Sequence, residues 1–552
     1  MTSSLPHLIA APIVLPLLAA ALMLLLGDAR ARLRAWINVL ASGAGLFVAL
    51  SLLRRIDAQG APGVLRVYLA SNWEAPFGIV LVADRLSAVM LVLVGVVSLG
   101  SAVYALAAWG RAGIYFNALF QIQIMGLNGA FLTGDLFNLF VFFEVLLAAS
   151  YGLHLHGSGW ARVHTGLHYI AVNLLASALF LVGLALLYGI MGTLSMADIA
   201  RKLPYVAPTD RGLLHAGAAI LAVAFLTKAA MWPLSSWLVP AYVAASAPVA
   251  AMFALMTKVG VYALLRLSTL FFSDQAGPSA HFGAGVLLYG GLATGAFGTL
   301  SLMSSLRLGR IAGSSILVSS GTLLAAVGIG ATQVTAGALF YLMSATLAAS
   351  ALFLLVELVE RPGTRGKRPR LADIDVEPDE DTNLDDEEEA LVGRALPVSQ
   401  ALLGLAFIAC ALVVAGLPPL SGFIAKLALA SALLGQDGGT SGAAIAPATW
   451  AFFGLLLVSG LTATISLARA GIRYIWSRPE GQPPRLTVVE GVPVIALIVA
   501  CAWLTVRAES VMRYASATAA ALHAPSAYIE AVLSEKPRPG PTRRVVEEAA
   551  VP

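Results

Sequence analysis

Apolar stretches of about 20 residues recur along the whole sequence, and few folds accommodate that pattern. A helix of about 20 apolar residues spans the ~30 Å hydrocarbon core of a bilayer, whereas the strands of a membrane barrel alternate in polarity over ~10 residues. Hydrophobic residues make up 59% of the 552, and only 12% are charged; soluble domains have roughly 45–50% and 25%. We therefore predict an all-α polytopic membrane protein.

The apolar runs predict about fourteen transmembrane helices. The runs cover residues 5–26, 36–53, 86–109, 115–133, 135–155, 165–190, 213–246, 248–272, 283–304, 311–330, 335–358, 397–434, 448–470 and 488–506. The first run has no basic segment before it and is long enough to span, so we expect a retained helix rather than a cleaved signal peptide.

Proline interrupts two of these runs at similar places. Pro233 begins PLSSW in 213–246, and Pro418 and Pro419 precede LSGF in 397–434. Proline cannot donate to the carbonyl four residues earlier, and two interrupted spans at corresponding positions are typical of an ion path built from inverted repeats. The seventh and twelfth helices are thus predicted to be broken.

The repeat hypothesis divides the chain into five parts. These are three N-terminal helices (1–110), a first five-helix repeat (115–272), a second, inverted repeat (283–472), a last helix (488–506) and a C-terminal tail (507–552).

The loop inside the second repeat is unusually charged. Residues 361–370 are basic, and 373–389 carry eleven carboxylates. A run of like charge with little apolar content cannot bury enough surface to fold. We expect a disordered linker over 361–394; a docking site for a basic partner is the alternative.

Basic residues in the loops predict the orientation. Loops on the cytoplasmic side carry the excess of Lys and Arg, and alternate loops here hold sixteen and eight. The richer set contains Arg30, Arg32, Arg34, Arg111, Arg162, Arg307, Arg310, five residues of 361–370, Arg469, Arg473, Arg478 and Arg485. Both termini are then expected outside the cytoplasm, in a protein of the cell inner (plasma) membrane.

Charge and cysteine content argue against several functions. The net charge of +4 is small and lies in loops, which gives no support for nucleic-acid binding. Cys410 and Cys501 fall within apolar runs, where cysteine is a small core residue rather than a disulfide or metal ligand. We expect no metal site, no cofactor and no redox chemistry in this chain.

Four ionisable residues that lie away from the ends of predicted helices are the candidate site. Glu144 is nine residues after Asp135, about 13.5 Å into its helix; Asp135 itself is expected to cap that helix. Lys228 precedes the first break, Lys258 lies ten residues beyond Pro248, and Lys426 follows the second break. A charge at this depth costs at least a few kcal/mol and usually serves a function.

These four side chains are chemically suited to proton transfer. Burial makes a lysine release its proton more easily, and an approaching carboxylate has the opposite effect. A change of three pKa units corresponds to about 4 kcal/mol, comparable with the ~2.3 kcal/mol gained by a charge crossing 100 mV. The alternative is a buried ion pair between Glu144 and Lys228 that only fixes helix register, which would leave Lys258 and Lys426 unexplained.

Other polar residues are weaker candidates for a role in proton transfer. His154, His156, His164 and His168 cluster around one predicted cytoplasmic loop, where they could admit protons or simply belong to a surface loop. Serines and threonines in 311–330 and 335–358 could hold a file of water or pack helices together.

Three stretches carry a family resemblance. GLNGAFLTGDLFNLFVFFEVLLAASYGL (126–153), LTKAAMWPLSSWLVPAYVAASAPVAAMFALMTKVGVYALLR (226–266) and AGLPPLSGFIAKLAL (415–429) resemble the antiporter-like subunits of respiratory complex I and of the Mrp multisubunit cation/proton antiporters. TGDLFNLFVFFEV and TKVGVYALLR are most similar to the D subunit of the Mrp antiporters.

The resemblance implies fourteen helices, inverted five-helix repeats and a central polar axis. It also implies that Glu144, Lys228, Lys258 and Lys426 are the family's proton-carrying residues. Many relatives have a His or Lys in the eleventh helix, where this chain reads YLMSATLAAS (341–350). Water is then expected to link the two halves here.

The function expected from the sequence is a proton-translocating subunit of a multisubunit Na⁺(K⁺)/H⁺ antiporter, active only with its partner subunits. A pumping subunit of complex I or of a membrane-bound hydrogenase is the related alternative. A non-conducting membrane scaffold is the alternative of another class.

Overall fold

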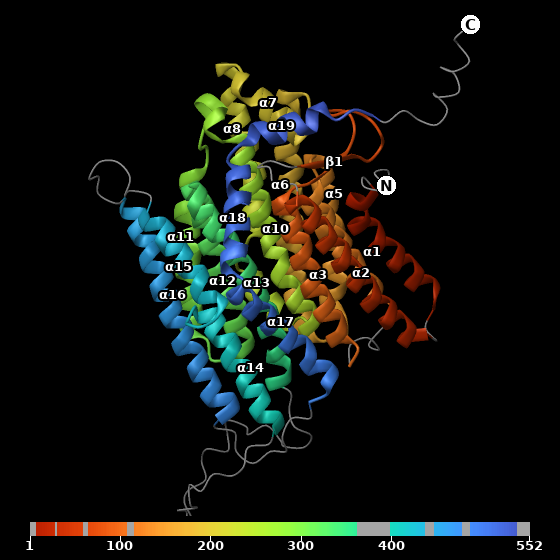
Figure 1. Cartoon of the computed structure of the whole chain (residues 1–552), viewed down its shortest axis with the longest axis vertical. Coiled ribbons are helices and arrows are strands. Elements are labelled where there is room, and N and C mark those ends of the chain that lie inside the picture. Colours follow the sequence, from red (N-terminus) through yellow and green to blue (C-terminus); the bar gives the residue numbers. More distant parts are fainter. Residues whose placement is uncertain are drawn as a thin grey trace, which may run out of the picture.

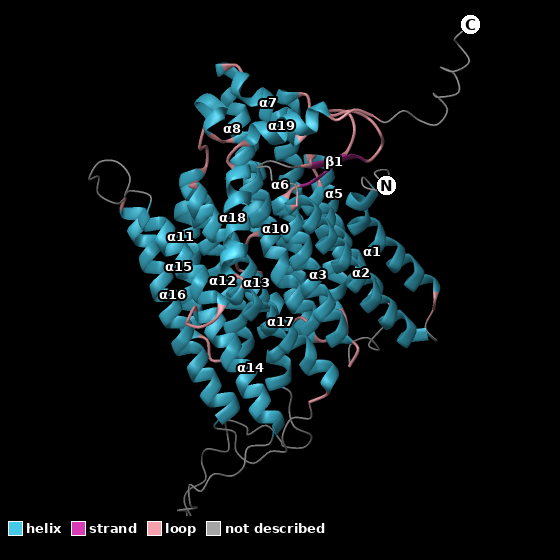
Figure 2. Ribbon diagram, viewed as in Figure 1, coloured by secondary structure: helices cyan, strands magenta, loops and turns pink. Residues whose placement is uncertain are grey.

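The fold is a bundle of long helices that run roughly parallel to one another (Figure 1, Figure 2). A computed structural model describes residues 7–27, 30–58, 65–107, 115–360, 398–435, 446–476 and 486–537. The predicted linker at 361–394 lies outside the described residues. Within them, thirteen helices are long and apolar enough to cross a membrane, which confirms the all-α polytopic class.

Each predicted run contains a helix. The helices are α1 (His7–Leu25), α2 (Ala31–Asp57), α3 (Arg85–Ala105), α4 (Phe116–Leu132), α5 (Leu136–Leu155), α6 (Trp160–Met191), α8 (Pro208–Lys228), α9 (Leu238–Ala244), α10 (Ala247–Phe271), α11 (Ala284–Ser304), α12 (Leu308–Ile329), α13 (Thr332–Glu360), α14 (Val398–Ala415), α15 (Ser421–Gly435), α16 (Pro447–Gly471) and α17 (Val488–Val506). Two runs hold two helices each, because α8 with α9 and α14 with α15 are separated by breaks.

Two of the long helices are enclosed by the others along their whole apolar length. The apolar windows of α10 and α12 are 100% buried, and that of α13 is 89% buried. The outer helices α1 and α2 are only 33% and 28% buried. Groups in the apolar windows of α10 and α12 are therefore surrounded by protein, and so are most of those on α13.

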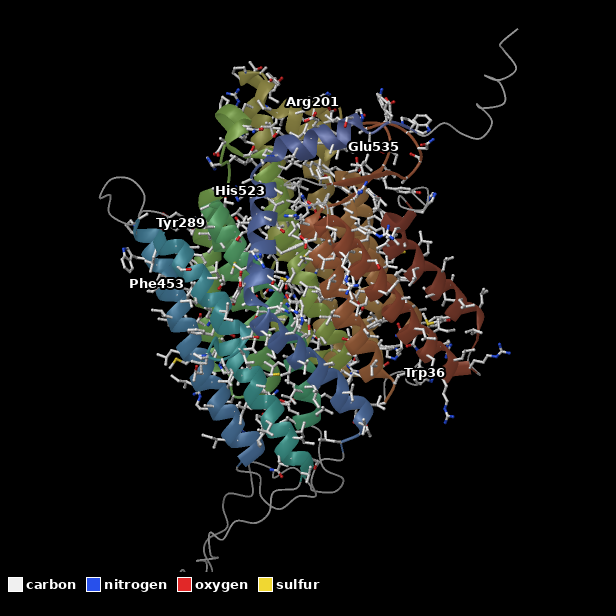
Figure 3. The ribbon with its side chains drawn as sticks, in the orientation of Figure 1. Trp36, Arg201, Tyr289, Phe453, His523 and Glu535 are labelled. Carbon is white, nitrogen blue, oxygen red and sulfur yellow. The ribbon has the colours of Figure 1, made fainter. Side chains whose placement is uncertain are left out.

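One end of the bundle carries additional short elements. They are a hairpin of β1 (Arg66–Leu69) and β2 (Val80–Ala83), α7 (Met196–Lys202), η3 (Leu203–Tyr205), η4 (Asp274–Ser279) and α19 (Pro525–Ser534). The preceding helix, α18 (Ala508–Leu522), runs inside the bundle against α13 toward this end (Figure 1), and η5 (Ile472–Trp476) continues α16. Arg201 and Glu535 mark this end in Figure 3, and Trp36 lies near the opposite end. The segment after the last predicted span, left as a tail by the sequence, thus folds into α18 and α19.

The start of α5 is anchored at this same end. Asp135 caps α5, since its carboxylate accepts the amide of Asn138 at 2.9 Å. The amide of Gly134 donates to Val80 of β2, and the amide of Met196 donates to the carbonyl of Gly134. These bonds set the height of α5, and with it the depth of Glu144.

Candidate functional site

The first break begins directly after Lys228, ahead of the proline. Ala230 has a left-handed φ of 56°, and the amides of Ala230 and Met231 donate back to the carbonyls of Thr227 and Leu226. This is a Schellman turn, which ends a helix by satisfying its last carbonyls. Pro233 therefore lies in the non-helical segment rather than inside a helix. Lys228 becomes the last residue of α8, at the negative end of the helix dipole.

Lys228 is buried and bonded to a neutral amide. Its Nζ donates to Oδ1 of Asn173 on α6 at 3.1 Å. The other side of that amide, Nδ2, donates to the carbonyl of Tyr169 at 2.8 Å, which orients the oxygen toward the lysine. The sequence analysis missed Asn173, although a lone asparagine in an apolar run was a signal for it.

Glu144 acts on Lys228 through space rather than by contact. Its charge interacts with that of Lys228, yet the ammonium is bonded to Asn173 and no salt bridge joins the two among the described residues. One carboxylate oxygen, Oε1, is buried with no hydrogen-bond partner in this part of the chain. A closed ion pair that fixes helix register is therefore not what the structure contains.

Lys258 lies at the centre of the bundle. It is 1% exposed on α10, and its Nζ donates to Oγ of Ser319 on α12 at 2.7 Å. Gly260 lets α10 approach the end of α8, because a Cβ at that position would lie 2.6 Å from the amide nitrogen of Ala229. The two lysine-bearing helices are thus in close backbone contact where α8 ends.

The second break repeats the geometry of the first. Gly416 has a φ of 77°, and the amides of Gly416 and Leu417 donate to the carbonyls of Val413 and Leu412. The helix again ends before the prolines, here at Ala415. Lys426 on α15 reaches back across the break, and its Nζ donates to the carbonyl of Ala415 at 2.8 Å.

A small cavity joins the surroundings of Lys258 and Lys426. It has a volume of about 30 Å³, and its polar lining consists of Ser315, Ser319, Tyr341, Ser344, Lys426 and Ser459. Ser319 accepts the hydrogen bond from Lys258 and also lines the cavity, so it connects Lys258 with the cavity. A cavity needs roughly 10–15 Å³ to hold a water molecule, and this one is large enough. Tyr341 lies on the helix that the resemblance would have given a His or Lys.

The four histidines divide into two pairs. His154 is fully buried beside Tyr169 and Phe253, and His156 is partly buried with its carbonyl bonded to Arg162. His164 and His168 are exposed on α6, where His164 stacks on Trp160 and His168 contacts Ser236 at 3.3 Å. Burial, and then the charge of Arg162, hold the pKa of His156 below its usual value.

A second buried charge cluster, which the sequence analysis did not identify, lies near the end that carries the short elements. Arg266 on α10 pairs with Asp84, and its guanidinium lies 5.5 Å from the ring centres of both Tyr262 and Tyr528. Burial raises the pKa of Asp84, but Arg266 and the amide of Ser87 outweigh it and hold that pKa below its usual value. Asp84 and Arg266 are thus in direct contact, in contrast to Glu144 and Lys228.

The family described as "NADH:quinone oxidoreductase/Mrp antiporter, TM" matches residues 133–445, which include all four candidate proton carriers. The chain is 52% identical over 543 residues to the D subunit of a probable K(+)/H(+) antiporter of Rhizobium meliloti (strain 1021), covering 98% of this chain and 100% of the relative. It is 33% identical over 538 residues to the D subunit of the Na(+)/H(+) antiporter of Alkalihalophilus pseudofirmus, covering 96% and 100%. Among solved structures, a chain of the Mrp complex from Dietzia sp. DQ12-45-1b is similar with a TM-score of 0.78 at 26% identity, covering 97% of this chain and 100% of that one.

Proposed function

Because the chain belongs to the family of D subunits of Mrp-type multisubunit cation/proton antiporters, we propose that it moves protons along Glu144, Lys228, Lys258 and Lys426. It is a transporter subunit and works as part of a multisubunit complex. Protons would reach the first broken helix, pass Lys228 under the control of Glu144, cross by Lys258 and leave by Lys426. The two relatives that are 52% and 33% identical over their whole length are antiporter D subunits, which favours this function over the complex I-like alternative.

The observation that carries the proposal is the set of partners of the three lysines. Each ammonium donates to one neutral oxygen: the Asn173 amide, the Ser319 hydroxyl or the Ala415 carbonyl. A carboxylate in contact would hold the proton more strongly, because a nearby opposite charge favours the charged form of the lysine. With a neutral acceptor, the lysine can be either protonated or deprotonated.

Glu144 supplies the variable part of this arrangement. Its interaction with Lys228 depends on distance and on whether the carboxylate is ionised. At an effective dielectric constant of 20, two charges 4 Å apart interact by about 4 kcal/mol, and the interaction falls as the distance grows. A small movement of Glu144, or its protonation, would therefore load or unload the lysine.

The cavity between Ser319 and Lys426 supports transfer between the two halves. Water in a cavity of about 30 Å³ could connect Lys258, through Ser319, with Lys426. Water bridges are nearly as favourable as direct hydrogen bonds and can carry a proton. This would take the place of the charged residue that the eleventh predicted span lacks.

We place the protein in the plasma membrane with both termini outside the cytoplasm. The basic residues support this orientation, since the described members of the richer set include Arg162, Arg307 and Arg469. The end that carries α7 and α19 would then face away from the cytoplasm.

The test is ΔpH-driven Na⁺ and K⁺ exchange in everted vesicles that contain the whole assembly. Glu144→Ala and Lys228→Ala variants that still co-purify with their partner subunits should lose exchange by roughly a hundredfold, the scale of a lost proton carrier. Normal exchange in both variants would instead identify the chain as a non-conducting scaffold.

A further inference from the structure

The C-terminal half of α5 and its cap carry four polar side chains that end in unpartnered atoms. The atoms are Oε1 of Glu144, Oη of Tyr151, Nδ1 of His154 and Nε2 of His156, each buried and without a hydrogen-bond partner in the described part of the chain. At 1.5 Å per residue the four residues span about 18 Å along the helix. We call this set the α5 column.

Such a concentration of unsatisfied groups is costly in a dry interior. A buried donor or acceptor without a partner costs about 1–3 kcal/mol, and buried polar groups are otherwise satisfied by protein or ordered water. Because the four atoms follow one helix from mid-span to its end, water serving them would form a continuous file rather than isolated sites.

Tyr151 is placed to connect the two ends of the column. It lies seven residues after Glu144, hence on nearly the same face of α5, and a helical side chain leans toward the N-terminus of its helix. The leaning ring brings its hydroxyl toward Glu144, and the two groups interact electrostatically. A hydroxyl both donates and accepts, so it can pass a proton without becoming ionised.

Aromatic rings enclose the column on the side of α6 and α10. The ring of Tyr169 lies 5.3 Å from that of Tyr151 and 5.9 Å from that of His154, and Phe253 stacks on His154 at 6.4 Å. The hydroxyl of Tyr169 is already bonded to Ser150 at 2.7 Å. Gly166 leaves room for the imidazole, because a Cβ there would lie 3.0 Å from Cδ2 of His154. The walls are apolar, and the open hydroxyl is that of Tyr151.

Arg162 closes the far end of the column. Its Nη1 donates to the carbonyl of His156 at 2.8 Å, and its Nε donates to the carbonyl of Ala244 at 3.0 Å. Glu357 on α13 interacts with the Arg162 charge and accepts the amide of Ala247 at the start of α10. One guanidinium thus joins α5, α6, α9 and α13 over the point where the column reaches the surface.

We infer that the α5 column is the path by which protons reach Glu144 from the cytoplasm, with Tyr151 as its relay and Arg162 with Glu357 as its gate. This deepens the proposed function and rests on it. In each step Tyr151 gives its hydroxyl proton toward Glu144 and takes another from the His154 side, so charge and protons balance. The backbone carbonyl of His156 accepts from Arg162, and its ring packs against Phe116; in its neutral form this imidazole can both donate and accept. His164 and His168 lie outside the path.

The decisive variant is Tyr151→Phe, which keeps the ring and removes the hydroxyl. Exchange in vesicles of the whole assembly should fall roughly tenfold or more, with the largest deficit when the pH on the Arg162 side is high and protons are scarce there. Tyr169→Phe is the matched control, since it removes a neighbouring buried hydroxyl that is already bonded, and it should exchange at near the unaltered rate. Equal losses in the two variants would reduce Tyr151 to a packing residue and overturn the path.

A second pair of variants tests the histidines. His154→Ala should slow exchange, whereas His164→Ala on the exposed face of α6 should not; the reverse pattern would place the path elsewhere. The outcome for Glu144→Ala separates the two proposals. If that variant loses exchange while Tyr151→Phe and His154→Ala keep it, the path alone is wrong. If Glu144→Ala keeps exchange, the proposed function itself is wrong.

Discussion

The Nζ atom of Lys426 lies 2.8 Å from the carbonyl oxygen of Ala415, the residue at which α14 ends. The second half of this broken helix thereby reaches back and caps the first half. At the other break, Lys228 is itself the last residue of α8. In both halves an ammonium lies at the C-terminal end of a helix, where the dipole contributes about 0.3–1 kcal/mol, and up to ~2 kcal/mol in partly buried sites, toward keeping it charged.

Gly460 on α16 makes room for the contact between Lys426 and Ala415. A Cβ at this position would lie 3.1 Å from Nζ of Lys426 and 2.9 Å from the carbonyl oxygen of Ala415. Gly460→Ala should displace the ammonium and slow exchange about tenfold, as expected for losing a hydrogen bond worth about 1.5 kcal/mol. Gly454→Ala on the same helix, where a Cβ would meet no atom within 4 Å, is the control. Similar rates for the two variants would contradict this positioning of Lys426.

Asn173 should be intolerant of a charge. Asn173→Asp keeps the shape of the side chain but sets a carboxylate 3.1 Å from Nζ of Lys228. The resulting ion pair would hold the proton on the lysine, so exchange should fall roughly tenfold or more while the assembly still forms. The measurement is the initial rate of exchange per assembled complex. An unchanged rate would show that a neutral partner is not required.

The sequence identifies the charged members of this site, but of their partners it offers only Ser319, as one of many serines and threonines that could hold water or pack helices. Glu144 and the three lysines stand out because a charge inside an apolar run is rare. Asn173, Ser319 and Tyr341 are residue types that also pack helices together, and they come from helices distant in sequence. Their importance emerges only when α6, α12 and α13 are placed around the lysines.

For the two helix breaks as well, the sequence predicts one part of the structure but not another. Proline marked where each helix is interrupted, yet the turns themselves lie at Ala230 and Gly416. Gly416 is a residue that favours a left-handed conformation, whereas alanine at 230 gives no such signal because its Cβ disfavours positive φ. Close packing of α8 against Gly260 of α10 holds that conformation, and a tertiary contact of this kind cannot be read from local sequence.

The Asp84 and Arg266 pair should behave as a structural element. Asp84→Leu leaves a buried guanidinium without its carboxylate, which costs about 3–5 kcal/mol, whereas replacing both members by apolar residues is often neutral. The purified assembly with Asp84→Leu should unfold at a clearly lower temperature, and Asp84→Leu with Arg266→Met should recover most of the loss. A double variant as unstable as the single one would argue for a function beyond packing.

Attachment of α18 should weaken in acid. His523 follows α18 (Figure 3) and bonds to Oγ1 of Thr335 on α13 at 3.1 Å. Burial lowers the pKa of His523, and the carboxylate of Asp274, which also pairs with His281, opposes this only partly. The docked state of α18 therefore binds the proton less readily than the released state. The stabilisation of the docked state by His523 is complete above about pH 6.5, the ordinary pKa of histidine, and is lost as the pH falls below that value toward the lowered pKa.

Hydrogen exchange of residues 508–534 measures this release. Between pH 7.5 and 5.5, after correction for intrinsic rates, protection should drop by about twofold or more. His523→Gln, which can still bond to Thr335 but does not titrate, should show the same protection at both values. A drop of equal size in that variant would assign the effect to another group.

The cavity between Ser319 and Lys426 yields the sharpest test of transfer between the two halves. Ala345 lines it without contributing a polar group, so Ala345→Val fills space needed by water and removes no hydrogen bond. Exchange should fall by roughly tenfold or more if protons cross here, because a dry gap between Lys258 and Lys426 has no donor or acceptor to carry them. Ala345→Ser, which adds a hydroxyl and little volume, should keep exchange close to the unaltered rate. Equal rates in the valine and serine variants, in assemblies recovered at equal yield, would mean that protons pass between the two halves by a route that avoids this cavity.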